Sequence, residues 1–131
     1  MIECTACKNG TVPCLHNVPL FKNLEGEQIR AVQQLIIQKD LAVGDVLFRE
    51  GDIFSSLYLL RFGSVKLVRY GSEGREYVID TLFAGDFYGG DQLFNESTAR
   101  ETGVVLSESG ICMLRFSDLQ RLILSNPQIA L

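Results

Sequence analysis

The chain has 131 residues, of which 47% are hydrophobic and 21% charged, and its net charge is -4. This length and composition predict one globular domain that buries a core without disulfide or metal staples. The acidic charge argues against a domain that binds nucleic acid by itself, and the lack of a signal peptide or a membrane-spanning apolar run predicts a cytoplasmic protein without a membrane partner.

An arm and a helix open the chain. Residues 1–20 contain scattered glycine and proline and are expected to form an irregular arm. Apolar residues then recur at helical spacing up to Ile36, which predicts an amphipathic helix near residues 25–36 with Asn23 as its N-cap. The sequence therefore divides into the arm and a folded domain over residues 21–131.

Short strands are predicted from Gln38 onward. The apolar runs become short, rich in β-branched and aromatic residues, and are separated by glycines. The stretch LVRYGSEGREYVID predicts the clearest hairpin, with its tip at Gly71–Gly74. Many short strands with glycine turns are typical of an antiparallel sandwich or roll. We therefore expect a mainly β fold, an antiparallel β-roll of the jelly-roll or double-stranded β-helix kind, with flanking α-helices.

The helical period returns near the C-terminus. The stretch DLQRLILS predicts a helix near residues 117–125 with Ser117 as its N-cap. Pro127 suits the first turn of a further helix, of which barely one turn is present. We therefore expect the sequence to be cut before a longer helix.

Three motifs of the strand-rich region resemble the sensory domain of the Crp/Fnr superfamily of bacterial transcription regulators. They are LFREGD, LYLLRFGSVKL and LFAGDFYGG, and each places glycine beside a short strand. The resemblance runs from about residue 20 to the end and implies the sensing half of a transcription factor. An enzyme of the cupin type is not expected, because it needs histidine ligands on inward strands and the only histidine, His16, lies in the arm.

The resemblance also implies partners. Members of the superfamily continue into a long dimer helix and a helix-turn-helix DNA-binding domain, and neither is present in this sequence. The full-length protein would therefore be a homodimer that binds DNA and RNA polymerase. The present chain would bind no nucleic acid and would be a monomer or a weak dimer.

A cyclic-nucleotide pocket is one sensing chemistry of the superfamily, in which a glycine-rich segment, an arginine and a hydroxyl residue bind the phosphate and a glutamate binds the ribose. The corresponding segment, GDFYGGDQLFNESTARET, includes Gly89 and places Arg100 at the phosphate-binding position. Gly90 takes the place of the ribose-binding glutamate, and Glu101 takes the hydroxyl position. Asp91 adds a further negative charge, so we expect cyclic AMP to bind weakly or not at all.

Two alternatives stay open for this segment. Arg100 could pair with Asp91, Glu96 or Glu101 and simply close the roll, because arginine suits partly buried carboxylate pairs. A small ligand without a phosphate could also bind inside the roll.

The other sensing chemistry concerns the four cysteines of the chain. Three lie in the arm as Cys4-x2-Cys7-x6-Cys14, and the fourth, Cys112, stands far along the chain. This pattern resembles the oxygen-sensing Fnr branch, in which three clustered N-terminal cysteines and a remote fourth bind a [4Fe–4S] cluster. The resemblance implies that these four cysteines hold such a cluster, which senses oxygen or redox state and is lost in air.

Three other interpretations of the cysteines stay open. Cys112 could be a core residue, because it alternates with Leu114 and Phe116 on one strand face and cysteine is often buried. The arm cysteines with His16 or Cys112 could bind zinc. A reversible disulfide between an arm cysteine and Cys112 could act as a redox switch without a cluster.

Overall fold

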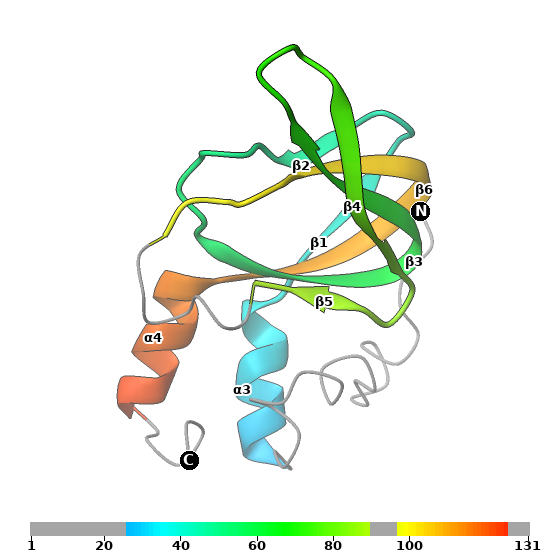
Figure 1. The fold of residues 1–131 in the computed structure, drawn as a ribbon. Helices are drawn as coiled ribbons and strands as arrows, with labels where there is room; N and C mark the ends of the chain where they lie inside the picture. Colours follow the sequence, from blue (N-terminus) through cyan, green and yellow to red (C-terminus); the bar gives the residue numbers. More distant parts are fainter. Residues whose placement is uncertain (1–25, 90–96, 126–131) are drawn as a thin grey trace.

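The computed structural model describes residues 26–89 and 97–125 and shows a curled antiparallel sheet above two helices (Figure 1). The elements are α3 (Glu27–Leu35), β1 (Ile37–Leu41), β2 (Val46–Phe48), β3 (Ser56–Tyr70), β4 (Glu76–Phe83), β5 (Phe87–Tyr88), β6 (Thr102–Arg115) and α4 (Phe116–Ser125). The main sheet order is β1-β6-β3-β4, while β2 also pairs with β6 and β5 with β3. This confirms the expected mainly β roll with flanking helices.

The two longest strands, β3 and β6, form the centre of the roll. They pair antiparallel from Ser56 opposite Arg115 to Val68 opposite Thr102, and the register shifts around Phe62 and Ser64. Such bulges increase the local twist and bend the strands, which lets one sheet curl on itself. The curl is what brings β2 and β5 close to the central pair.

Apolar side chains bury against both faces of this central pair. One cluster connects the sheet with the helices and includes Leu59, Leu114, Val32 of α3 and Leu119 of α4. A second cluster consists of Leu60, Val65, Val105 and Ile111. Partly buried leucines of β1, β2 and β4 pack against the second cluster.

The helix boundaries differ slightly from the expected ones. α3 begins at Glu27 with Gly26 as its N-cap, whereas Asn23 was expected at that position. Gly26 has φ 56°, a backbone conformation that glycine adopts without strain. α4 begins at Phe116, whose backbone N–H donates to Ser55 O at 2.9 Å, so the expected cap Ser117 lies inside the first turn.

The hairpin of β3 and β4 is confirmed where the sequence predicted it. The two strands pair from Ser64 opposite Phe83 to Tyr70 opposite Glu76. The backbone N–H of Gly74 donates to Gly71 O at 2.9 Å and closes the tip. The hairpin projects beyond the rest of the roll (Figure 1).

A buried arginine ties three strands together on one face of the sheet. Gly110 of β6 stands between Asp40 of β1 and Phe62 of β3. Arg61 of β3 reaches across this glycine, and its Nη2 lies 3.0 Å from Asp40 Oδ1 while its side chain is only 3% exposed. The guanidinium also lies 5.5 Å from the centroid of the Phe62 ring.

Replacing Gly110 by Ala should therefore destabilise the domain by about 2 kcal/mol. The new Cβ would overlap the Phe62 ring and lie 2.7 Å from Arg61 Nη2, so both side chains must move. Urea unfolding measures the change in the free energy of unfolding. Lys66→Ala is the control, because its pair with Glu76 is partly exposed and its loss should cost no more than about 0.5 kcal/mol. An equal loss in both variants would contradict the role given to Gly110.

Candidate functional site

The chain that enters β6 is fastened to the loop between β2 and β3. The N–H of Phe54 donates to Ser97 O at 2.9 Å, and that of Ala99 donates to Asp52 O at 2.8 Å. The backbone N–H of Glu50 donates to Thr102 Oγ1 at 2.9 Å. Residues 97–102 therefore have a fixed path beside the interior of the roll.

Gly89 lets the chain pass directly over an aromatic ring. It follows β5, has φ 100°, and a Cβ at this position would lie 2.6 Å from Phe54 Cζ. Both the conformation and the close approach require glycine. The expected pocket residue Gly89 thus has a structural role that the described contacts explain.

Glu101 directs its carboxylate toward two donors from other strands. The Tyr88 hydroxyl, on β5, donates a hydrogen bond to Glu101 Oε2. Arg69 of β3 places Nη2 3.9 Å from Glu101 Oε1, and its Nε donates to Arg100 O at 3.1 Å. The Glu101 side chain is only 12% exposed, so this carboxylate is largely withdrawn from water.

Aromatic rings form the wall behind this carboxylate. Tyr88 stacks on Phe48 with ring centroids 5.1 Å apart and an interplanar angle of 4°. Phe54 meets Tyr88 edge to face at 5.5 Å, and Tyr58 lies 5.4 Å from Phe48. Burial raises the pKa of the Tyr58 hydroxyl, so it stays protonated at neutral pH. These contacts hold the Tyr88 ring in one orientation.

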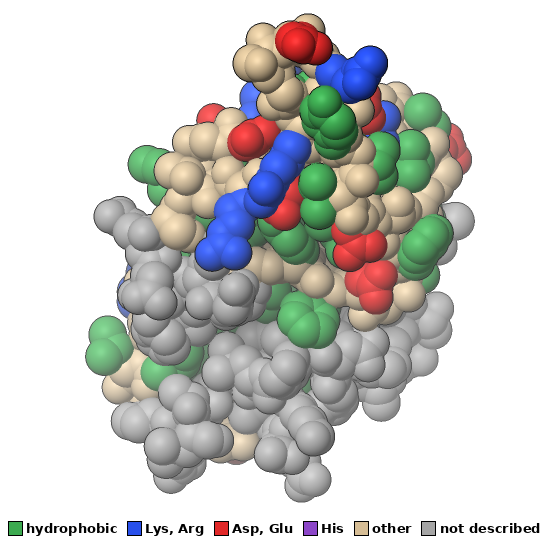
Figure 2. All heavy atoms as spheres, in the orientation of Figure 1, with side chains coloured by type: hydrophobic (Ala, Val, Ile, Leu, Met, Phe, Trp, Pro, Cys, Tyr) green, Lys and Arg blue, Asp and Glu red, His purple; other side chains and the backbone are tan. Residues whose placement is uncertain are grey.

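Arg100 and Glu101 are adjacent in the chain but lie in different environments. The Arg100 residue is exposed, and the ion pair found for Glu101 is with Arg69. The suggested pairing of Arg100 with Glu101 is therefore wrong, because the Glu101 side chain turns inward while Arg100 faces solvent. Figure 2 shows basic side chains gathered on the face below the hairpin, with acidic ones beside them. Gly90, Asp91 and Glu96 lie outside the described residues.

Cys112 lies in the cluster between the sheet and the helices. It is fully buried, stands opposite Leu59 of β3 and Gln38 of β1, and packs in the cluster that contains Val32 of α3. Its neighbour Ile111 belongs to the other cluster. This is the environment that the core interpretation predicts for Cys112.

The other metal candidates are not in the described part of the chain. Cys4, Cys7, Cys14 and His16 all fall within residues 1–25, as does the whole predicted arm. Residues 26–89 and 97–125 contain no group of three histidine, cysteine or acidic side chains that could hold a metal ion.

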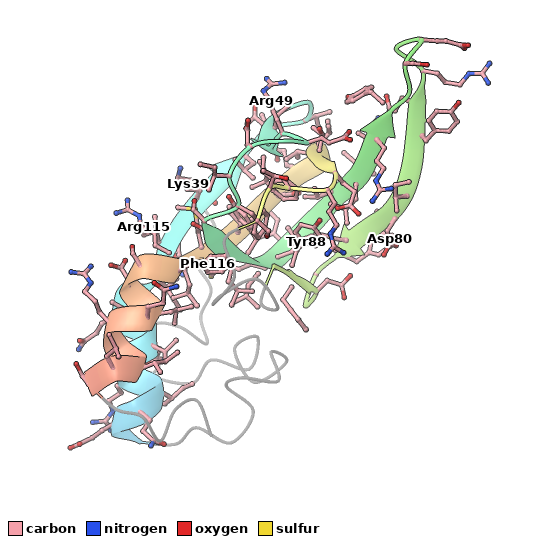
Figure 3. The ribbon with its side chains drawn as sticks, turned by 60° about the vertical axis from the view of Figure 1, so that its left-hand side comes forward. Lys39, Arg49, Asp80, Tyr88, Arg115 and Phe116 are labelled. Atoms are coloured by element: carbon pink, nitrogen blue, oxygen red, sulfur yellow. The ribbon has the colours of Figure 1, made fainter. Side chains whose placement is uncertain are left out.

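A hollow lies where β4 turns into β5. It is lined by Asp80, Leu82, Ala84, Gly85, Asp86 and Phe87. Asp86 Oδ2 accepts the N–H of Phe83 at 2.8 Å, and Asp80 Oδ1 accepts the N–H of Thr81 at 2.8 Å. These carboxylates therefore serve the turn and the strand. Figure 3 shows Asp80 on the hairpin side, whereas Lys39, Arg49 and Arg115 point outward along the opposite edge.

The sequence does not predict that Arg69 and Tyr88 belong to the site. Tyr88 belongs to the motif LFAGDFYGG, but nothing in the spacing shows that its hydroxyl meets a residue 13 positions later. Arg69 stands next to the hairpin tip and resembles a solvated strand residue. Their meeting with Glu101 depends on the pairing of β3 with β5 and β6, which local patterns do not encode.

Among the helices that the structure describes, none is long and apolar enough to cross a membrane.

Comparison with known proteins gives one consistent family. Residues 38–126 match the model described as "Cyclic nucleotide-binding domain". The chain is 30% identical to the "Probable transcriptional regulator flp" of Lacticaseibacillus casei, with 90% of this chain and 53% of that protein covered. It is 27% identical to the "Cyclic AMP receptor protein" of Thermus thermophilus, with 86% and 52% covered. The chain thus spans about half the length of these curated relatives.

A solved structure shows the same likeness. The N-terminal domain of a transcriptional regulator from Streptomyces coelicolor A3(2) is similar with a TM-score of 0.82 and 33% identity, covering 89% of this chain and 82% of that one. The names of these relatives describe regulators and a receptor, in agreement with the expectation that the domain is not an enzyme.

Proposed function

The chain belongs to the cyclic nucleotide-binding domain family, in the form that Crp/Fnr-type regulators carry, and from this premise we propose that it is the sensory domain of a bacterial transcription regulator. The full-length protein would act as a homodimer on DNA and RNA polymerase. This chain alone would be a monomer or a weak dimer. The family match over most of the roll supports the proposal.

The effector that we propose is a small ligand other than a cyclic nucleotide. The single observation that carries this part is the inward carboxylate of Glu101, 12% exposed and bound by Tyr88. A cyclic phosphate brought to this carboxylate would meet a like charge in a partly desolvated site, where repulsion is stronger than in water. Stacked Phe48 and Tyr88 also take up space beside it.

Cyclic AMP should accordingly bind to this domain no tighter than about 1 mM, a free energy near 4 kcal/mol. Isothermal titration calorimetry on the intact chain measures this dissociation constant. Cyclic GMP serves as a second ligand, because the repulsion acts on the phosphate that both share. Micromolar binding that Arg100→Ala abolishes would contradict the proposed effector class.

A second proposal concerns the cysteines. Cys4, Cys7, Cys14 and Cys112 would bind a [4Fe–4S] cluster that senses oxygen or redox state, as in the Fnr branch. Supporting it are the four thiols themselves and the place of Cys112 on a central strand, three residues before β6 ends at Arg115. A ligand on this strand would connect the cluster to the centre of the sheet, where β6 pairs with β1, β2 and β3.

Anaerobic purification with an absorption spectrum and iron and sulfide analysis tests the cluster. Equal iron and sulfide, bleached by air, would support it. Zinc without sulfide would support the zinc alternative. A metal-free protein with a bond to Cys112 that reductant breaks would support the disulfide switch.

A further inference from the structure

A hydroxyl and a guanidinium converge on one largely buried carboxylate, the first through a hydrogen bond and the second through an ion pair. Tyr88 comes from β5 and Arg69 from β3, while Glu101, which carries the carboxylate, directly precedes β6. The three residues are far apart in sequence and meet because β3 pairs with both β5 and β6, with Val68 opposite Thr102 next to the site. The hydrogen bond from the Tyr88 hydroxyl is charge-assisted, a kind that is stronger than a neutral hydrogen bond.

Both donors are held in place by contacts that do not involve Glu101. The Tyr88 ring is fixed by its stack on Phe48 and its edge contact with Phe54. Arg69 is fixed by the hydrogen bond from its Nε to Arg100 O. A phenolic hydroxyl and a guanidinium aimed at one point would therefore persist if the carboxylate were removed, and together they suit an oxyanion.

The site also has access to solvent. The Arg69 side chain is 49% exposed, whereas that of Glu101 is 12% exposed. An anion could therefore approach past Arg69 and reach the position that the Glu101 carboxylate holds.

We propose that Tyr88 and Arg69 form an oxyanion site that the chain's own Glu101 carboxylate occupies. An external oxyanion, the phosphate or carboxylate of a ligand, binds there only when it displaces Glu101. This inference rests on the proposed sensory function and specifies its regulation. Because Glu101 is an intramolecular ligand, its effective concentration is on the order of millimolar or higher, and a free anion at lower concentration does not compete.

Inorganic phosphate is the probe, titrated into wild type and Glu101→Ala at constant ionic strength. The substitution removes the carboxylate that Tyr88 and Arg69 contact. NMR signals of the Arg69 side chain and the Tyr88 amide, with the melting temperature, report binding. We expect saturable shifts in Glu101→Ala at a Kd at least about tenfold below that of wild type.

Three further variants make the test specific. Adding Arg69→Gln to Glu101→Ala should abolish the gained binding, and adding Tyr88→Phe should weaken it. Glu108→Ala removes an exposed glutamate of β6 and should gain nothing. A folded Glu101→Ala protein without a saturable response, or equally tight binding by wild type, overturns the proposal.

The proposal can be tested even if the Glu101→Ala variant fails to fold. If Glu101→Ala is unfolded in phosphate-free buffer, phosphate should refold it, since a ligand that binds only the native state stabilises that state. Failure of phosphate to refold it, while wild type is folded, also overturns the proposal. Tight cyclic AMP binding by wild type would instead contradict the proposed effector class, so the two failures are distinguishable.

Discussion

Replacing Gly63 by Ala should destabilise the domain by about 4 kcal/mol. Gly63 has φ 93°, which L side chains rarely adopt, and it stands where the register between β3 and β6 shifts. An added Cβ would overlap the carbonyl oxygen of Glu108 and lie 2.7 Å from Ser109 Cα. These are backbone atoms of the central partner strand, so relief requires the two strands to separate.

Gly74→Ala is the matched control for this prediction. Gly74 also has a positive φ, 79°, but a Cβ there meets no atom within 4 Å. Its substitution should cost only the conformational part, about 1 kcal/mol. Urea denaturation of both variants gives the two free energies of unfolding. Similar losses would show that the crowding at Gly63 is relieved without cost, against the expectation.

Loss of iron from Cys112→Ala is the second expected large effect. If four thiolates share one [4Fe–4S] cluster, removing one leaves an iron site open to exchange and oxidation. Anaerobic reconstitution should then load wild type with about four irons per chain, and Cys112→Ala should retain as little as Cys7→Ala. Iron and sulfide analysis with the absorption spectrum measures this.

The burial of Cys112 makes a stability control necessary. Cys112 is fully buried in the cluster with Val32 and Leu114, so Cys112→Ala should cost about 1 kcal/mol of packing and leave the iron content unchanged if Cys112 is only a core residue. Val32→Ala, in the same cluster, should cost about 2 kcal/mol and keep its iron. Full iron incorporation in Cys112→Ala would eliminate the four-cysteine assignment, and equal loss in Val32→Ala would attribute the effect to packing.

Features that depend on residues close together in the sequence could be predicted, whereas contacts between distant strands could not. The hairpin tip at Gly71–Gly74 follows from glycine in a short turn between apolar runs. The burial of Cys112 follows from strand alternation. The cap of α3 is not predicted correctly because Asn23 and Gly26 both suit an N-cap, and the structure has Gly26 at that position.

The site shows the same division. The segment that contains Arg100 and Glu101 was found from its motif, but the inward turn of Glu101 toward Tyr88 was not. The same holds for Arg61, whose burial over Gly110 requires three strands to lie in register. Pairs of this kind are fixed by contacts across the sheet, and a single sequence does not display them.

The strand order has a consequence for the protein as it leaves the ribosome. Within the described residues β1 pairs only with β6. Ile37 can therefore pair with Met113 only after Met113 has been synthesised. The hairpin of β3 and β4 forms between strands that are close in sequence, whereas Ser56 can pair only after Arg115 has been synthesised. Synthesis proceeds from the N-terminus at about 5–20 residues per second, so the nascent roll stays open for several seconds. During this interval the apolar face of β3 lies uncovered, which makes the incomplete chain a natural client for chaperones.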